Sequence, residues 1–451
     1  MDEINSTELL EMLEAKQFQA LHTKFEEMYA VDIAEFLEDI PEERLLVTFR
    51  LLPKDLAAET FVELSADTQE ALIRAFSDTE LKTIIDELFV DDTVDIIEEM
   101  PANVVKRILK NTDPAMRVSI NEILRYPHDS AGSIMTTEFV DLKASMTVEE
   151  SFRRIRETGP DKETLYTCYI TDANRHLEGL VSVRTLLLSD PQVKLEDIME
   201  TNIISVTTVE DKEEVAKCFE KYGFLALPVV DAENRLVGIV TVDDAIEVMQ
   251  EEVSEDFAKM AAITPTEKTY LETSVFSHAK NRILWLLILM LSATFTGILI
   301  TEYEEAFSAM PLLVSFIPML MDTGGNCGAQ SSTMIIRGLA MDEIRFSDYF
   351  RVLFKEIRIS LCISITLAVV NALRVLIMYG FTSNTFMIAV VLGITLIFGV
   401  MLAKALGCSL PMLAKKCKLD PAIMASPLIT TIVDACSVLI YFNVATLILD
   451  L

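Results

Sequence analysis

The charge of this chain is confined to its first 280 residues. They hold 59 Asp and Glu against 27 Lys and Arg, whereas residues 281–451 hold 11 of each kind, so the whole net charge of −32 lies in the first part. The second part consists largely of long apolar runs. This asymmetry predicts an integral membrane protein with a large acidic domain in water. An excess of carboxylates argues against nucleic acid as a partner.

Five apolar runs are long enough to span a hydrocarbon core of roughly 30 Å at ~1.5 Å per residue. They cover about residues 283–301, 308–335, 359–379, 386–411 and 422–448. Basic residues precede the first run and fill the connections between the second and third and between the fourth and fifth. Because basic loops face the cytoplasm, we expect the N-terminal domain inside and the C-terminus outside.

Two internal repeats organise the acidic half. Residues 1–125 show helical periodicity, and the segments 31–53 and 93–114 resemble each other, which favours a small superhelical domain of helix pairs. Residues 126–252 alternate between strand-like and helical patterns, and Gly179-Leu-Val-Ser-Val is matched by Gly238-Ile-Val-Thr-Val. This second repeat resembles a tandem pair of CBS domains, an α/β module, with copies at 126–198 and 199–252.

CBS pairs often bind adenine nucleotides, and the resemblance implies where. The family's nucleotide signature is complete only in the second copy, as Gly238, Thr241 and Asp244, because the first copy has Thr185 in place of the aspartate. ATP is therefore one possible regulatory ligand, and a purely structural CBS pair is the other reading. Residues 243–280 follow as an acidic connecting helix, which is either a linker or a lever toward the membrane.

An acidic residue lies within the fifth apolar run. Asp434 is thirteen residues beyond Pro421, or ~20 Å along a helix axis. A lone carboxylate at that depth costs at least ~2.5–3.5 kcal/mol, so it should face a bundle interior, water or a cation. A protonated acid in a helix contact and an ion pair with Lys404 are the alternatives.

The second run supplies further polar groups. Asp322 and Asn326 flank Gly324 and Gly325, and Gly328 follows, so this run is expected to break. The glycines should let helices approach closely and make backbone oxygens accessible. Small residues alone would indicate tight packing, but beside an acid, an amide and hydroxyls they favour a polar pore lining. Ser426, beside Pro427, adds a hydroxyl at the start of the fifth run. Oxygen ligands without His or Cys suit a hard cation such as Mg²⁺. One carboxylate per chain cannot strip Mg²⁺ of its water, but two chains could hold the hydrated ion between paired Asp434 side chains, so a homodimer is the natural hypothesis.

Taken together, the chain resembles the MgtE family of magnesium channels. The resemblance covers the helical N-domain, the CBS pair, the connecting plug helix and the five spans, in that order. Its most specific motifs are Asp420-Pro421-Ala422 with Asp434 in the fifth span, and Thr323-Gly-Gly-Asn-x-Gly-x-Gln in the second. The resemblance implies a homodimer in the cell membrane that passes Mg²⁺ inward and closes when cytoplasmic Mg²⁺ is high.

The resemblance also implies site residues. The pore ion would bind at Asp434, with Asp322, Asn326 and Ser426 in the lining. Regulatory Mg²⁺ would bind acids on the N-domain, the CBS pair, the plug helix and the head of the fifth span: Glu59, Asp91, Asp95, Glu213, Asp244, Glu247, Glu252, Glu255 and Asp420. Asp91 and Asp92 are adjacent, so either could be the ligand. The ion would pull separate acidic domains together and hold the plug helix closed.

Some positions depart from the family pattern. Gly223 replaces a sensing Asp of some members, Ser426 an Asn, and Ala329 a polar residue, whereas Asp322 stands where others have Gly. A secondary transporter that couples a divalent cation to protons or Na⁺ is the main alternative function, and a sensor anchored in the membrane is another. No enzymatic motif is found, including Walker, phosphorylation-type DKTG and Ser/His/Asp patterns.

Overall fold

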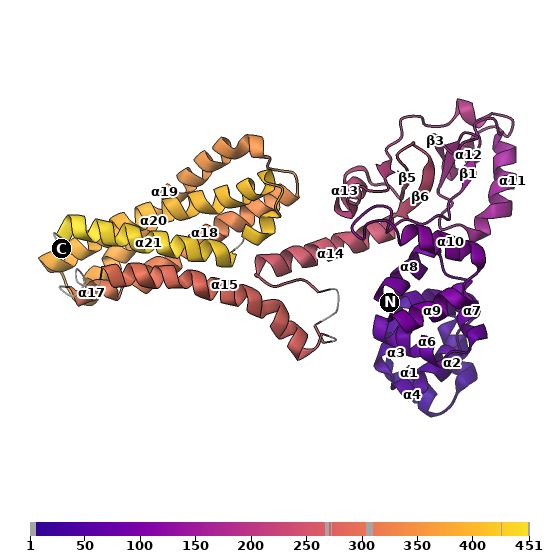
Figure 1. Ribbon diagram of the computed structural model, residues 1–451, viewed down its shortest axis with the longest axis horizontal. Coiled ribbons are helices and arrows are strands. Elements are labelled where there is room, and N and C mark those ends of the chain that lie inside the picture. Colours follow the sequence, from indigo (N-terminus) through magenta and orange to yellow (C-terminus); the bar gives the residue numbers. More distant parts are fainter. Residues whose placement is uncertain (1–5, 267–269, 272, 304–309, 425, 450–451) are drawn as a thin grey trace. The chain divides into compact units, whose positions relative to one another are not determined.

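The computed structural model describes residues 6–449 except 267–269, 272, 304–309 and 425, and of Ser426 it describes the backbone alone. The chain forms two compact units, Met1–Met249 and Gln250–Leu451 (Figure 1).

The first unit begins with short helices whose apolar faces pack together. They are α1 (Ser6–Glu14), α2 (Phe18–Phe25), α3 (Ala30–Asp39), α4 (Glu42–Phe49), α5 (Lys54–Val62), α6 (Ala66–Ala75), α7 (Asp78–Ile85), α8 (Val90–Glu99), α9 (Ala102–Asn111) and α10 (Pro114–Ile123). Three aromatic rings, Phe49, Phe61 and Phe76, meet at centroid distances of 5.5–6.3 Å and join α4, α5 and the end of α6. Helices this short are marginal alone, so their stability comes from this shared core.

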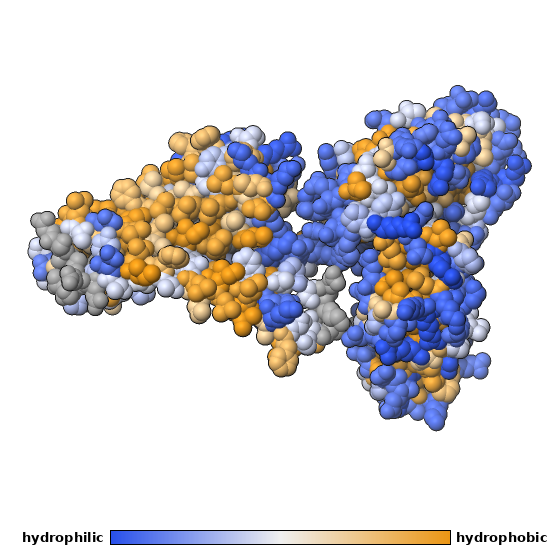
Figure 2. All heavy atoms as spheres, in the orientation of Figure 1, coloured by the Kyte–Doolittle hydropathy of each residue, from blue (hydrophilic) through white to orange (hydrophobic). Residues whose placement is uncertain are grey.

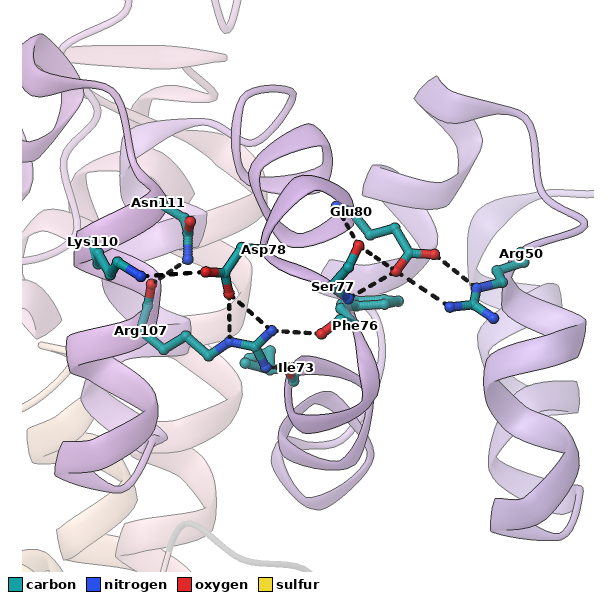
Figure 3. A network of polar contacts seen from close by, with 9 residues as sticks. All are labelled: Arg50, Ile73, Phe76, Ser77, Asp78, Glu80, Arg107, Lys110 and Asn111. Carbon is teal, nitrogen blue, oxygen red and sulfur yellow. Dashed lines mark hydrogen bonds and ion pairs between the residues drawn. The ribbon is translucent and has the colours of Figure 1, made fainter.

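Polar contacts join helices of this domain that are distant in sequence (Figure 3). Arg107 of α9 donates to backbone carbonyl oxygens at the end of α6 and pairs with Asp78 at 3.2 Å. Glu80 forms a capping box with Ser77 at the start of α7 and accepts from Arg50 at 2.8 Å. The Arg50 hydrogen bond and the Ser77 contacts lower the pKa of Glu80 to about 2. The carboxylate therefore stays charged and holds α4 against α7 at neutral pH.

Two similar three-stranded sheets follow. In each, the first strand runs parallel and the third antiparallel to the middle one. The first copy contains β1 (Asp141–Leu142), α11 (Val148–Thr158), η1 (Gly159–Asp161), β2 (Thr167–Thr171), β3 (Leu177–Ser182) and α12 (Val183–Leu188). After η2 (Leu195–Asp197), the second copy contains β4 (Val206–Thr207), α13 (Lys212–Tyr222), β5 (Ala226–Val230), β6 (Leu236–Thr241) and α14 (Val242–Met260).

The two copies exchange their leading segments. Met135 packs over Gly238 in β6 of the second copy, and Met199 packs over Gly179 in β3 of the first. A Cβ atom at either glycine would lie 2.6 Å from the methionine sulfur. The backbone follows the same exchange, since Thr136 pairs with Ile239 and Leu180 with Glu200. The repeated glycines of the sequence are thus required by close packing.

The second unit is a bundle of long helices. They are α15 (Val275–Glu302), α17 (Pro311–Val314), α18 (Ile317–Ala340), α19 (Tyr349–Tyr379), α20 (Ser383–Lys416) and α21 (Ser426–Leu449), with short turns η3 (Phe346–Asp348) and η4 (Pro421–Met424). In the described residues, four helical segments are long and apolar enough to cross a membrane: Val275–Glu302, Phe346–Tyr379, Ser383–Lys416 and Pro421–Leu449. The face of this unit visible in Figure 2 is largely apolar, as a lipid-facing surface requires.

The second apolar run differs from its predicted form. Its first residues, 308 and 309, lie outside the described residues, and the rest forms the short α17 and the 24-residue α18, which is not one of the four apolar segments. The glycines do not break α18, because they are positions of close packing: a Cβ at Gly324 would lie 2.6 Å from Ser437 Oγ and one at Gly325 2.7 Å from Thr430 Cγ2. The five-span count, the orientation and the domain boundaries stay predictions.

Candidate functional site

An acidic cluster lies where α8 of the helical domain meets the CBS pair. Asp91 and Asp95 on α8 interact electrostatically with Asp244 at the start of α14, and Asp95 also with Glu247. Burial is the main cause that raises the pKa of Asp95 to about 8 and that of Asp244 to about 7, and neighbouring carboxylates add to it. Asp91 is buried and its pKa is likewise well above the usual range. These acids therefore repel one another when charged.

Two further acids, Glu138 and Glu163, complete this cluster. Glu138 Oε2 accepts hydrogen bonds from the backbone N–H of Val90 and from Thr136 Oγ1, both at 3.0 Å, so it ties the N-terminus of α8 to the CBS pair. Burial first and then nearby carboxylates raise the pKa of Glu163 to about 8. Asp92 is also part of the cluster, and burial raises its pKa to about 6. Both Asp91 and Asp92 thus belong to the cluster.

The cluster suits a divalent cation by its donor chemistry. All its side chains offer carboxylate oxygens, and the buried Oδ1 atom of Asp91 has no hydrogen-bond partner in the described part of the chain. Among the same residues, no three His, Cys, Asp or Glu side chains are gathered closely enough to form a ready-made metal site. The residues fit Mg²⁺ as a hydrated ion that bridges carboxylates, because this ion keeps several of its waters.

Other predicted regulatory residues lie elsewhere. Glu59 is exposed on α5, and the nearby carboxylate whose charge acts on Asp92 is Glu63, the residue that follows α5. Glu213 on α13 pairs with Lys217 at 2.8 Å. The prediction that Glu59 and Glu213 bind a regulatory ion stays a prediction.

A cavity of about 870 Å³ opens in the CBS pair on the side of α12. Tyr166, Arg184, Asn202 and Phe224 are among its lining residues, and Ser182 of the first copy also faces it. The predicted nucleotide residues are not in this lining: Gly238 is packed under Met135, and Asp244 Oδ2 accepts from Thr241 Oγ1 at 2.6 Å. Motif matching pointed to the signature of the second copy, whereas the cavity is lined by residues of both copies.

The helices of the second unit place Asp434 beside α18. Val433 and Ser437, its neighbours on α21, pack against Gly324, and the charges of Asp434 and Asp322 act on each other. Asn326 Nδ2 donates to Asp322 Oδ1 at 3.1 Å. The buried Oδ1 atom of Asp434 has no hydrogen-bond partner among the described residues. Asp322, Asn326 and Asp434 therefore form one polar group on two adjacent helices.

The polar start of α21 is also tied to α18. Ser332 Oγ donates to the carbonyl oxygen of Met424 at 2.8 Å, at the break between η4 and α21. Ser426 begins α21, and its side chain, predicted as a pore ligand, lies outside the described residues.

Lys404 does not pair with Asp434. Its Nζ atom donates to Ser331 Oγ at 3.0 Å and lies 3.8 Å from Glu356 Oε2, while Ser331 Oγ donates to the same carboxylate at 2.6 Å. The side chains of Lys404 and Glu356 are only 5% and 12% exposed. The triad neutralises itself and connects α20, α18 and α19 inside the bundle. Sequence periodicity gave no signal for it.

The remaining predicted acids lie at or near the end of α14: Glu252 and Glu255 on the helix itself, and Asp420 just before η4. Glu255 and Asp420 both contact Lys259, whose Nζ atom lies 2.5 Å from Glu255 Oε1 and 2.6 Å from Asp420 Oδ2. Glu252 lies one turn before Glu255 on the same helix. Glu255 and Asp420 thus lie on either side of one lysine, and the prediction that they share a regulatory ion stays a prediction.

Comparisons with models of known protein families show which class of protein the chain belongs to. Models of three families match: the MgtE intracellular N domain over residues 28–129, the CBS domain over 131–190 and 195–251, and the divalent cation transporter MgtE over 317–444. The order is that of a divalent cation transporter preceded by an MgtE intracellular N domain and two CBS domains.

Relatives then identify the family. The magnesium transporter MgtE of Thermus thermophilus is 35% identical over 454 residues, with all of both chains covered. That of Bacillus subtilis is 32% identical over 421 residues, covering 93% of this chain and 92% of its own. The chain therefore belongs to the MgtE family of magnesium transporters, which are not enzymes.

Two solved structures resemble the soluble half. The cytosolic domain of the Mg²⁺ channel MgtE in complex with ATP has a TM-score of 0.52 at 37% identity, and covers 54% of this chain and 99% of its own. The soluble part of a magnesium transporter has a TM-score of 0.51 at 29% identity, and covers 55% and 97%.

The acidic cluster predicts a pH-dependent contact between α8 and the CBS pair. The folded-state pKa values of Asp95 and Asp244 are raised to about 8 and 7, so folding favours their protonated forms. The stability that these protonated acids give to the contact is complete below about pH 4, the usual pKa of an aspartate. It is lost as the pH rises through these values. In a metal-free buffer, hydrogen-exchange protection factors in α8 should fall between pH 6 and 9. Asp95→Asn should flatten this profile, and Asp39→Asn, an exposed control on α3, should not. Identical profiles for the wild type and Asp95→Asn would contradict the prediction.

The buried triad predicts that single variants of Lys404 and Glu356 are less stable than the double variant. Lys404→Met or Glu356→Gln alone leaves one buried charge unpaired and should destabilise the second unit by ~3–5 kcal/mol. The double variant Lys404→Met/Glu356→Met should recover most of this loss. Thermal unfolding in detergent measures both effects, with Lys355→Met as an exposed control on α19. Additive losses in the double variant would show that the two charges do not depend on each other.

Proposed function

We propose that this chain is a homodimeric, channel-type importer of Mg²⁺ in the cytoplasmic membrane, with its first unit in the cytoplasm and closed when cytoplasmic Mg²⁺ is high. The observation that carries the transport part is Asp434, an acid on an apolar helix whose buried Oδ1 lacks a partner among the described residues. Family membership supports Mg²⁺ as the substrate. Two Asp434 side chains from two copies would hold the hydrated ion through its waters.

The regulatory part rests on the repulsion between carboxylates in the first unit. Asp91, Asp95 and Asp244 bring negative charge onto both sides of the contact between α8 and the CBS pair. Without a counter-ion, the charged forms push these elements apart, while Glu138 and its hydrogen bond to Val90 keep them together. Bound Mg²⁺ supplies the missing positive charge. Since α14 begins at this cluster and ends at Glu255 and Lys259, a change at one end can be carried along a stiff helix.

We also propose that the CBS cavity binds an adenine nucleotide. Tyr166 and Phe224 offer aromatic faces for the base, and Arg184 can pair with a phosphate in a fork. The ATP complex of the similar cytosolic domain supports the class of ligand. The cavity is preferred to the predicted Gly238, Thr241 and Asp244 site because those residues are packed against Met135 or turned to the acidic cluster.

Flux through purified protein tests the transport proposal. In liposomes with an internal Mg²⁺ indicator, wild-type flux should fall as Mg²⁺ rises on the cytoplasmic face. Asp434→Asn should reduce flux at least about tenfold at every concentration, a loss equivalent to ~1.4 kcal/mol or more in the barrier. Asp342→Asn, the same change at an exposed turn, should leave flux unchanged. Undiminished flux in Asp434→Asn refutes the pore assignment, and flux that requires a pH or Na⁺ gradient favours the coupled transporter.

Nucleotide binding tests the cavity. Arg184→Ala should weaken ATP binding to the full chain in detergent by about tenfold to a hundredfold, the range expected for a lost charge-assisted contact. Arg153→Ala, an exposed arginine on α11, is the matched control, and calorimetry is the measurement. If Thr241→Ala weakens binding and Arg184→Ala does not, the signature of the second copy is the site.

A further inference from the structure

Lys259 lies between two carboxylates that come from different elements. Its ammonium group contacts Glu255, one turn earlier on α14, and Asp420, which precedes η4, at 2.5 and 2.6 Å. The three side chains are 26%, 38% and 29% exposed, so the contact is half-buried and accessible to ions. Burial alone lowers the pKa of Lys259, but its hydrogen bonds to Asp420 and Glu255 outweigh burial and raise it. The lysine is therefore positively charged.

The chain itself fixes Asp420 for this contact. Oδ1 of Asp420 accepts a hydrogen bond from the backbone N–H of Ala422 at 2.8 Å, which starts the turn η4 and directs Oδ2 toward Lys259. Next to the lysine, Met260 packs against the buried side chains of Ile336 and Ala422. An ion pair and an apolar contact thus join the end of α14 to η4 and α18.

The family resemblance implies that these same two carboxylates bind a regulatory cation. The space between Glu255 and Asp420 is filled by an ammonium group, and a hydrated Mg²⁺ needs that space for its waters. Lysine and Mg²⁺ therefore exclude each other there. Either Lys259 or Mg²⁺ can neutralise the two carboxylates, and Lys259 differs from the ion in being part of α14.

We propose that Lys259 is a built-in counter-cation that keeps the end of α14 joined to η4 when Mg²⁺ is absent, and that Mg²⁺ binds between Glu255 and Asp420 only by displacing it. The inference rests on the proposed regulation by Mg²⁺ and deepens it. The end of α14 then stays in place at low Mg²⁺, and the response to Mg²⁺ at this point is weakened by competition. Partly exposed ion pairs contribute little each, so the lysine can be displaced.

The experiment measures hydrogen exchange in the full-length protein in detergent, in EDTA and in saturating Mg²⁺. In wild type, the amides of residues 255–262 should be protected in EDTA and change little with Mg²⁺. In Lys259→Gln, protection in EDTA should fall about threefold to tenfold, as expected for the loss of two partly exposed ion pairs, and should return with Mg²⁺. Lys259→Arg should behave as wild type. Lys82→Gln, which removes an exposed ion pair with Asp86 on α7, is the matched control.

Two results overturn the inference. One is equal protection of residues 255–262 in wild type and Lys259→Gln in EDTA, which shows that the lysine does not hold the contact. The other is a loss in Lys259→Gln that Mg²⁺ does not restore, which shows that the ion does not take the same place. Exchange in α8 of the same samples and flux in liposomes test the proposed function separately. If Mg²⁺ changes neither, the proposed regulation fails, while the comparison in EDTA still decides the role of Lys259.

Discussion

Carboxylates held away from bulk water shape both units of this protein. In the first unit, Asp91, Asp95 and Asp244 are buried near one another, and their raised pKa values show that the folded chain favours their neutral forms. In the second, Asp434 lies on an apolar helix against glycines of α18. Such groups are costly unless a positive charge or a proton accompanies them. A protein that moves and senses a divalent cation can use the ion itself for this purpose.

Two lysines, Lys404 and Lys259, neutralise carboxylates in the second unit in different ways. Lys404 is enclosed with Ser331 and Glu356, so its charge is paired permanently within the bundle. Lys259 contacts its carboxylates at a partly exposed position, where solvent and ions compete. Burial decides between the two roles: the enclosed triad contributes a fixed connection between helices, and the open one can exchange partners.

The sequence predicted what depends on local pattern and composition. The helical domain, the CBS pair, the apolar helices and the meeting of Asp91 and Asp95 with Asp244 follow from periodicity, repeats and the family resemblance. Contacts between distant elements were missed, because no spacing rule relates Glu138 to the N-terminus of α8 or Lys259 to Asp420. The glycines of α18 show the same limit: their pattern was compatible with a polar, broken helix and with tight packing, and the neighbouring Ser437 and Thr430 show that close packing requires them.

The exchange of leading segments between the CBS copies has a consequence for biosynthesis. Met135 emerges from the ribosome long before Gly238, the residue it packs on, and Thr136 must wait for Ile239 to complete its backbone pairing. The first copy therefore cannot reach its final form during translation until the second has been made. Until then Met135 and the backbone of Thr136 lack their final partners, and transiently exposed groups of this kind favour aggregation.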